Sequence, residues 1–77
     1  MEDLLKRIVI DPEVMVGKPV IKGTRITVEH IMRELATGAS TQEVLELYPH
    51  LTADDVRAAL AYAAARLAEE RITIAAE

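Results

Sequence analysis

The ten residues from Gly17 to Ile26 constrain the fold of this chain more than any other stretch. They read GKPVIKGTRI, so two glycines, a proline and two lysines frame an apolar pair. Proline forces an extended conformation on the residue before it, and glycine adopts the positive φ that a tight turn requires. Val20-Ile21 and Arg25-Ile26 flank Lys22-Gly23-Thr24, which predicts a tight hairpin with Gly23 in its turn.

A short strand is expected upstream of this run. Ile8-Val9-Ile10 is a β-branched triplet that Asp11-Pro12 brings to a stop. We expect the residues from Met1 to Arg7 to form a polar lead, and Glu13 to Val16 to be extended or a single turn. Residues 8–26 are therefore predicted to form a small N-terminal β element.

Two helices are expected next. Thr27 can cap the first, and Gly38 ends it in the position where glycine closes many helices. Ser40 and Glu43 form a capping box for the second helix, which stops before Pro49. The residues predicted to face inward are Val28, Ile31, Met32 and Leu35 in the first helix and Val44, Leu45 and Tyr48 in the second.

A third helix is expected to begin at Thr52 and to run to about Glu70. Asp54 and Asp55 favour its positive end, and its many alanines give it a high helix propensity. The alanines also allow another helix to approach closely. Its buried face is predicted to consist of Val56, Leu60, Ala63, Ala64 and Leu67.

The predicted fold is mainly α: a three-helix homeodomain-like or winged-helix-like domain with a small N-terminal β element, formed by a short strand and a hairpin. We expect a single domain over residues 1–77, with the three-helix core at 27–70 and a tail at 71–77. The short turn from Pro49 to Thr52 between two helices is the layout of many DNA-binding domains. Many other small helical proteins share it, so the layout does not establish DNA binding.

The composition excludes several classes of protein. The chain has no cysteine, so no disulfide or thiolate metal site can reinforce its fold. Two tyrosines are its only aromatic residues, apart from its histidines, which disfavours a surface that stacks nucleobases. No apolar run approaches the roughly 20 residues of a membrane-spanning helix, so we expect a cytoplasmic protein. A chain of 77 residues buries a small core, so a homodimer or a partner protein is expected.

Charge divides the chain into two unlike halves. Residues 1–38 hold six Lys/Arg and six Asp/Glu, whereas residues 39–77 hold three and seven and carry the whole net charge of −4. Lys18, Lys22 and Arg25 lie close together in the first half, so a polyanion such as operator DNA is expected to bind there. The acidic second half suits a basic protein partner.

Each of these cations also has a structural interpretation. Arg25 either contacts a phosphate or a partner carboxylate, or it forms an internal ion pair with Asp11 or Glu29 or bonds turn carbonyls. Of these we favour the structural role, in which Arg25 holds the run against the first helix. Lys18 and Lys22 either line DNA phosphates or are solvated side chains at a strand edge. The third helix begins with two carboxylates that repel phosphate, so we do not expect it to read the major groove.

No catalytic constellation stands out in the sequence. His30 and His50 have no second histidine or carboxylate at a metal-ligand spacing, and no serine or threonine has a base partner. Gly17-Lys18 lacks the flanking residues that a phosphate-binding loop requires. We therefore expect no enzyme activity, no cofactor and no metal. Three residues of the third helix and the tail are either a partner surface or core with a frayed end: Leu67, Ile72 and Ile74.

The motifs resemble those of a known family. Asp11-Pro12 and the run from Gly17 to Ile26 look like its first signature block, and Ala39 to Leu45 and Tyr48 to Val56 look like its second. Ala58 to Ala63 completes the match, which covers residues 8–68. The chain is similar to domain-of-unknown-function family 433, a group of small prokaryotic proteins. The positions that mark the motif are Gly17, Pro19, Gly23, Thr24, Arg25, Tyr48 and Pro49.

The resemblance implies a homeodomain-like helical fold with a small β element. It also implies an antitoxin-like role, because many members look like antitoxins encoded beside a PIN-type nuclease toxin. On that basis the protein would neutralise a PIN-like toxin by protein–protein contact and, as a dimer, would autoregulate its operon. The alternatives are a DNA-binding regulator without a toxin partner, or an uncharacterised structural or interaction protein.

Overall fold

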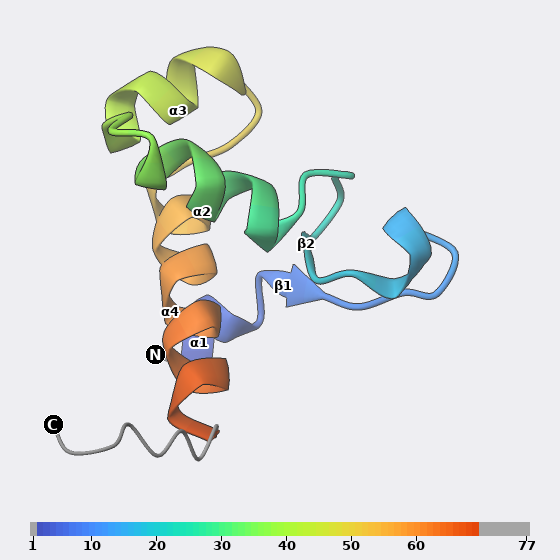
Figure 1. Cartoon of the computed structure of the whole chain (residues 1–77). Coiled ribbons are helices and arrows are strands. Elements are labelled where there is room, and N and C mark those ends of the chain that lie inside the picture. Colours follow the sequence, from blue (N-terminus) through green and yellow to red (C-terminus); the bar gives the residue numbers. More distant parts are fainter. Residues whose placement is uncertain (1, 70–77) are drawn as a thin grey trace, which may run out of the picture.

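The computed structural model describes residues 2–69 of the chain. In this part the fold is mainly helical with a small antiparallel β element near the N-terminus, as the sequence predicts (Figure 1). No helix among these residues is long and apolar enough to cross a membrane. The elements in order are α1 (Glu2–Leu5), β1 (Ile8–Val9), the 3-10 turn η1 (Met15–Gly17), β2 (Val20–Ile21), α2 (Val28–Ala36), α3 (Thr41–Leu47) and α4 (Ala53–Glu69).

The β element pairs differently from the predicted hairpin. Strand β2 lies antiparallel to β1, with Ile8 opposite Ile21 and Val9 opposite Val20. The expected pairing across Gly23 is reduced to a single bridge between Val20 and Thr27, with backbone hydrogen bonds from Ile21 N to the Ile26 carbonyl at 3.0 Å and from Val28 N to the Pro19 carbonyl at 2.9 Å. Strand β1 is the better partner because its Ile8 side chain packs against the core beside β2.

The helix ends are confirmed. The Thr27 hydroxyl accepts a hydrogen bond from His30 N at 3.0 Å, and Gly38 closes α2 with a φ of +102°. Ser40 and Glu43 form the predicted capping box, and α3 ends at Leu47, before Pro49. These ends are fixed by local chemistry, which explains why the sequence alone locates them.

The core lies where α2, α3 and α4 meet β2. Figure 1 shows α4 running along the whole body, with α2 and α3 at one end and α1 and the β element beside its middle. The elements β2, α2, α3 and α4 each contribute one or two buried apolar side chains, and together these form the small core. The buried cluster consists of Ile21, Val28, Ile31, Val44, Leu51, Val56 and Ala59.

Two expectations about the ends of the chain are wrong. Residues Glu2–Leu5 form a helical turn that packs on α4, where a polar lead was expected. The buried face of α4 is also rotated from the predicted one, because Leu60 is 43% exposed and Leu67 is 61% exposed. Alanines surround α4 on every side, so the sequence pattern does not reveal which side the core covers.

Candidate interaction surfaces

The segment from Gly17 to Ile26 is a scaffold that is fixed by its own backbone. Gly17 and Gly23 both have a φ of +81°, in the region where side-chain-bearing residues are strained. The Thr24 hydroxyl donates to the Ile21 carbonyl at 2.8 Å and accepts from Ile26 N at 3.0 Å. This local chemistry holds the turn in a single shape and sets where its basic side chains emerge.

The same segment is anchored to the start of α2. The Pro19 carbonyl accepts a hydrogen bond from Val28 N at 2.9 Å. Lys18 Nζ lies 3.1 Å from Glu29 Oε1, and Arg33 lies 2.8 Å from the other Glu29 oxygen. The Lys18 hydrogen bond and charge, with a smaller effect of Arg33, lower the pKa of the Glu29 carboxyl below its usual 4.5. Lys18 therefore serves partly as a structural link.

Arg25 does not have the structural role predicted for it. Its side chain is exposed, and among residues 2–69 it forms no ion pair with Asp11, Glu29 or any other carboxylate. The ion pair that links this segment to α2 is made by Lys18. Lys22 is also exposed without an ion pair in the described residues, and its backbone N–H donates to the Arg7 carbonyl at 2.7 Å.

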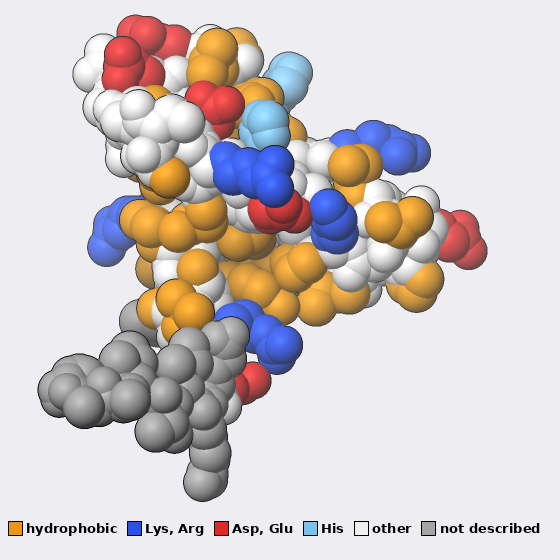
Figure 2. All heavy atoms as spheres, in the orientation of Figure 1, with side chains coloured by type: hydrophobic (Ala, Val, Ile, Leu, Met, Phe, Trp, Pro, Cys, Tyr) orange, Lys and Arg blue, Asp and Glu red, His pale blue; other side chains and the backbone are white. Residues whose placement is uncertain are grey.

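Basic side chains consequently gather on one side of the molecule. Figure 2 shows Lys and Arg groups in a band from α2 to the β element, with an acidic group between them. We call Lys18, Lys22, Arg25 and Arg33 the basic face. Since Glu29 offsets one of these four charges, the face keeps a surplus of positive charge on a chain whose net charge is −4.

A polar cluster that the sequence did not suggest lies beside the basic face. His30 Nε2 is hydrogen-bonded to the Tyr48 hydroxyl and lies 3.8 Å from Glu34 Oε2. The two rings meet edge to face, with centroids 5.5 Å apart. They border a hollow of about 210 Å³ that Arg25 also lines. The residues are 18 positions apart along the chain, so no spacing rule could have joined them.

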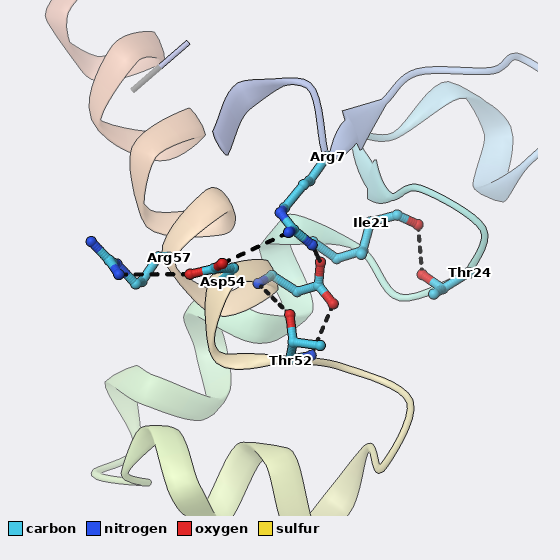
Figure 3. A network of polar contacts seen from close by, with 7 residues as sticks. Arg7, Ile21, Thr24, Thr52, Asp54 and Arg57 are labelled. Carbon is cyan, nitrogen blue, oxygen red and sulfur yellow. Dashed lines mark hydrogen bonds and ion pairs between the residues drawn. The ribbon is translucent and has the colours of Figure 1, made fainter. Parts of the chain in front are cut away.

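The N-terminus of α4 is occupied by the protein itself. Arg7 Nη1 lies 3.1 Å from Asp55 Oδ1, and Arg7 Nη2 lies 3.7 Å from Asp54 Oδ2 (Figure 3). Asp55 Oδ2 also accepts from Thr52 N at 2.9 Å, and Thr52 Oγ1 accepts from Asp55 N at 3.2 Å. The sequence predicts the capping role of these acids but not Arg7. Both carboxylates at this helix end are therefore paired within the protein.

An acidic surface lies on α3. Glu43, Glu46 and Leu47 line a hollow of about 480 Å³ against the turn that follows α2, and Leu47 is 59% exposed. We call these three residues the acidic face. Leu47 is therefore a large apolar side chain exposed beside two glutamates.

The remaining predicted contacts concern the end of the chain. Leu67 is exposed on α4, as a partner contact requires, whereas Ile72 and Ile74 lie outside the described residues. Within residues 2–69, no three His, Asp or Glu side chains converge so that they could hold a metal ion.

Comparison with other proteins places the chain among uncharacterised relatives. A model of the family described as "Protein of unknown function (DUF433)" matches residues 8–63. The uncharacterised protein y4eO of Sinorhizobium fredii is 39% identical over 54 residues, which are 70% of this chain and 24% of that protein. An uncharacterised protein of Archaeoglobus fulgidus is 62% identical over 29 residues, which are 38% of this chain and 81% of that protein.

A solved structure shares the fold. The crystal structure of a DUF433 member protein from Anabaena variabilis superimposes with a TM-score of 0.78 and 35% identity, over 88% of this chain and 67% of that one. By contrast, this chain spans about a quarter of the length of the Sinorhizobium protein. The residues that match the family model span the β element, α2, α3 and the first part of α4.

Proposed function

Since the chain belongs to the DUF433 family of proteins of unknown function, we propose that it is a non-catalytic binding module of the antitoxin type. In this role it neutralises a PIN-like nuclease by protein–protein contact. The observation that carries the proposal is the acidic face, where Leu47 is 59% exposed beside Glu43 and Glu46 of α3. A nuclease must present a basic surface to its nucleic acid, and an acidic protein competes for that surface.

The geometry of the acidic face suits this task. Glu43 is fixed by its capping box with Ser40, so its carboxylate is held in place before binding. The exposed Leu47 side chain supplies apolar area, and the hollow beside it can accept one partner side chain. The opposite charges then accelerate association with the nuclease, and burial of Leu47 slows dissociation of the complex.

The experiment is co-expression with the product of the adjacent reading frame, followed by co-purification and a growth assay. We expect the pair to co-purify and the chain to relieve toxicity. Replacing the acidic face with Glu46→Lys and Leu47→Ser should weaken the complex at least about tenfold. Failure of the wild-type chain to co-purify with, or to protect against, that product would contradict the proposal.

A matched double variant controls for charge and lost apolar surface. Ile10 is 58% exposed and Glu13 is exposed, so Ile10→Ser with Glu13→Lys makes the same chemical change away from α3. This control should bind as the wild type does. Equal weakening by both variants would show that net charge, and not the acidic face, determines binding.

The basic face favours a second candidate function, binding of operator DNA. Lys22 and Arg25 are exposed and form no ion pair among the described residues, so both can neutralise phosphates. The test is a gel shift with the DNA upstream of the gene, over a series of salt concentrations. Lys22→Glu with Arg25→Glu should abolish retention, whereas Lys6→Glu with Arg66→Glu should preserve it. Normal retention by the first variant would exclude the basic face.

A further inference from the structure

Helix α4 carries apolar side chains beyond its buried face. Val56 and Ala59 face the core and are fully buried. Leu60, Ala64 and Leu67 lie along the adjoining strip of the helix, which we call the outer face, and all three are exposed. The apolar surface of α4 is therefore wider than the core covers, and the excess is available for contact with a partner. Figure 2 shows hydrophobic groups along this part of the molecule.

The outer face contains a hollow with a specific shape. Its volume is about 360 Å³, and its lining is Leu4 of α1 with four residues of α4. Those four are Arg57, Leu60, Ala61 and Ala64, which stand at positions i, i+3, i+4 and i+7 of the helix. Four residues at this spacing form the hole that receives one side chain of a facing helix in knobs-into-holes packing.

A knob for this hole lies on the same helix. Leu67 follows the hole by one turn and is 61% exposed, the highest value among the leucines of α4. A two-fold interface requires a surface that is complementary to itself, so that each copy offers both the knob and the hole. The outer face of α4 meets that requirement.

We propose that the outer face of α4 packs antiparallel against the outer face of a second copy, with Leu67 of each chain in the hollow of the other. The two-fold axis then passes near Ala64, because that residue lies midway between Ala61 at the base of the hole and the Leu67 knob. In this register Leu67 lies over Ala61 of the other copy and Leu60 lies over Ala68. Each layer pairs a large side chain with a small one, which gives close packing without collisions.

The charge beside the hole is paired within its own helix. Arg57 forms part of the hole wall, and its guanidinium lies 3.6 Å from Asp54 of its own chain. The Arg57 charge is thus paired within the same helix. Its aliphatic stem remains available to cover the Leu67 side chain of the other copy. Leu4 adds the far wall, which gives the short helix α1 a second purpose besides packing on α4.

The dimer and the proposed function depend on different residues. The outer face shares no residue with the acidic face or with the basic face, so both stay exposed when α4 is paired. A monomeric chain that still binds the nuclease would overturn the dimer alone. A dimer without a nuclease partner would overturn the proposed function alone.

The first test measures the mass of the full chain in solution. A monomer has a mass of 8.5 kDa, and we expect light scattering after gel filtration to give twice that value. Leu67→Glu places a charge in the hole and should weaken the dimer on the order of 100-fold, to a monomer. Leu47→Glu is the matched control, because Leu47 has nearly the same exposure on α3, and it should remain a dimer. A monomeric wild-type chain, or a dimer that survives Leu67→Glu, would overturn the proposal.

The second test addresses the register and does not depend on loss of folding. The chain has no cysteine, so Ala64→Cys introduces a single thiol at the proposed axis. Mild oxidation should convert it into a disulfide-linked dimer that keeps the helical circular-dichroism spectrum of the wild type. Both variants are analysed by denaturing, non-reducing electrophoresis. Ala36→Cys, at an exposed position of α2, should migrate as a single chain without a disulfide-linked dimer. Equal cross-linking of both variants would overturn the antiparallel register.

Discussion

Replacement of Asp55 by alanine should destabilise the protein more than any other single change at an ion-paired residue. The Asp55 side chain is 11% exposed, and each of its two carboxylate oxygens accepts a hydrogen bond. One comes from Arg7 at 3.1 Å, which joins the segment after α1 to α4, and one comes from Thr52 N at 2.9 Å, which caps α4. Asp55→Ala removes both and leaves the Thr52 N–H without its acceptor.

The magnitude follows from these two contacts. Loss of a helix cap costs about 1 kcal/mol. Loss of a hydrogen bond to a charged group costs about 1.5 kcal/mol, and we take the lower end because the Arg7 side chain is 43% exposed and water screens it. The sum is about 2.5 kcal/mol, which corresponds to a fall in Tm of roughly 10–20 °C for a domain of this size.

The assay is urea denaturation and thermal melting followed by circular dichroism. Asp54 supplies the control, because it is the neighbouring residue and also pairs with Arg7, but at 3.7 Å and with a side chain 52% exposed. Asp54→Ala should cost less than about 0.5 kcal/mol. A double-mutant cycle of Arg7→Ala with Asp55→Ala should give a coupling energy of about 1 kcal/mol.

Two results would refute this reasoning. Equal losses from Asp54→Ala and Asp55→Ala would show that helix-end charge alone accounts for the effect. A coupling energy near zero would show that Arg7 contributes nothing through Asp55, and that α1 and β1 are held to α4 by apolar contacts only.

Three further predictions concern the basic face and the backbone. Lys18 lowers the pKa of the Glu29 carboxyl, so the pair of Lys18 with ionised Glu29 stabilises the fold above pH 4.5, the usual pKa of glutamate. This stabilisation is lost as the pH falls through the pKa of Glu29 in the folded state. Lys18→Met should therefore raise the Glu29 pKa in an NMR titration, and its effect on Tm should vanish in acid. Val16 is β-branched, 87% exposed and held at a φ of +50°, so Val16→Asn should stabilise the fold by about 1 kcal/mol in urea denaturation; a loss would contradict this. Gly38 has a φ of +102° with open space around it, so Gly38→Ala should cost about 1–2 kcal/mol through backbone strain alone.

Local chemistry made much of the fold predictable. The ends of α2 and α3 follow from Thr27, Gly38 and the capping box of Ser40, each of which acts within a few residues of itself. The positive φ of Gly23 and the mainly helical fold with a small β element follow in the same way. These features need only hydrogen bonds and backbone preferences that a short segment contains.

The candidate sites could be predicted only in part. Lys22 and Arg25 are exposed on one face, as their spacing in the turn suggests. Arg7 stood in a segment without any recognisable pattern, although it holds the N-terminus of α4. The contact between His30 and Tyr48 could not be predicted either, because only the packing of α2 on the α3–α4 turn brings these two residues together.

The sequence by itself determined where α2 and α3 begin and end, and where the backbone must turn, because those choices are settled by neighbours along the chain. Tertiary structure alone decided that β2 pairs with β1, that Lys18 and not Arg25 holds the turn to α2, and which side of α4 the core covers. The physical reason is clearest in α4. A helix rich in alanine is apolar all round, so only the bulk of α1, α2 and α3 against it determines that Val56 is buried and that Leu60 and Leu67 are left exposed.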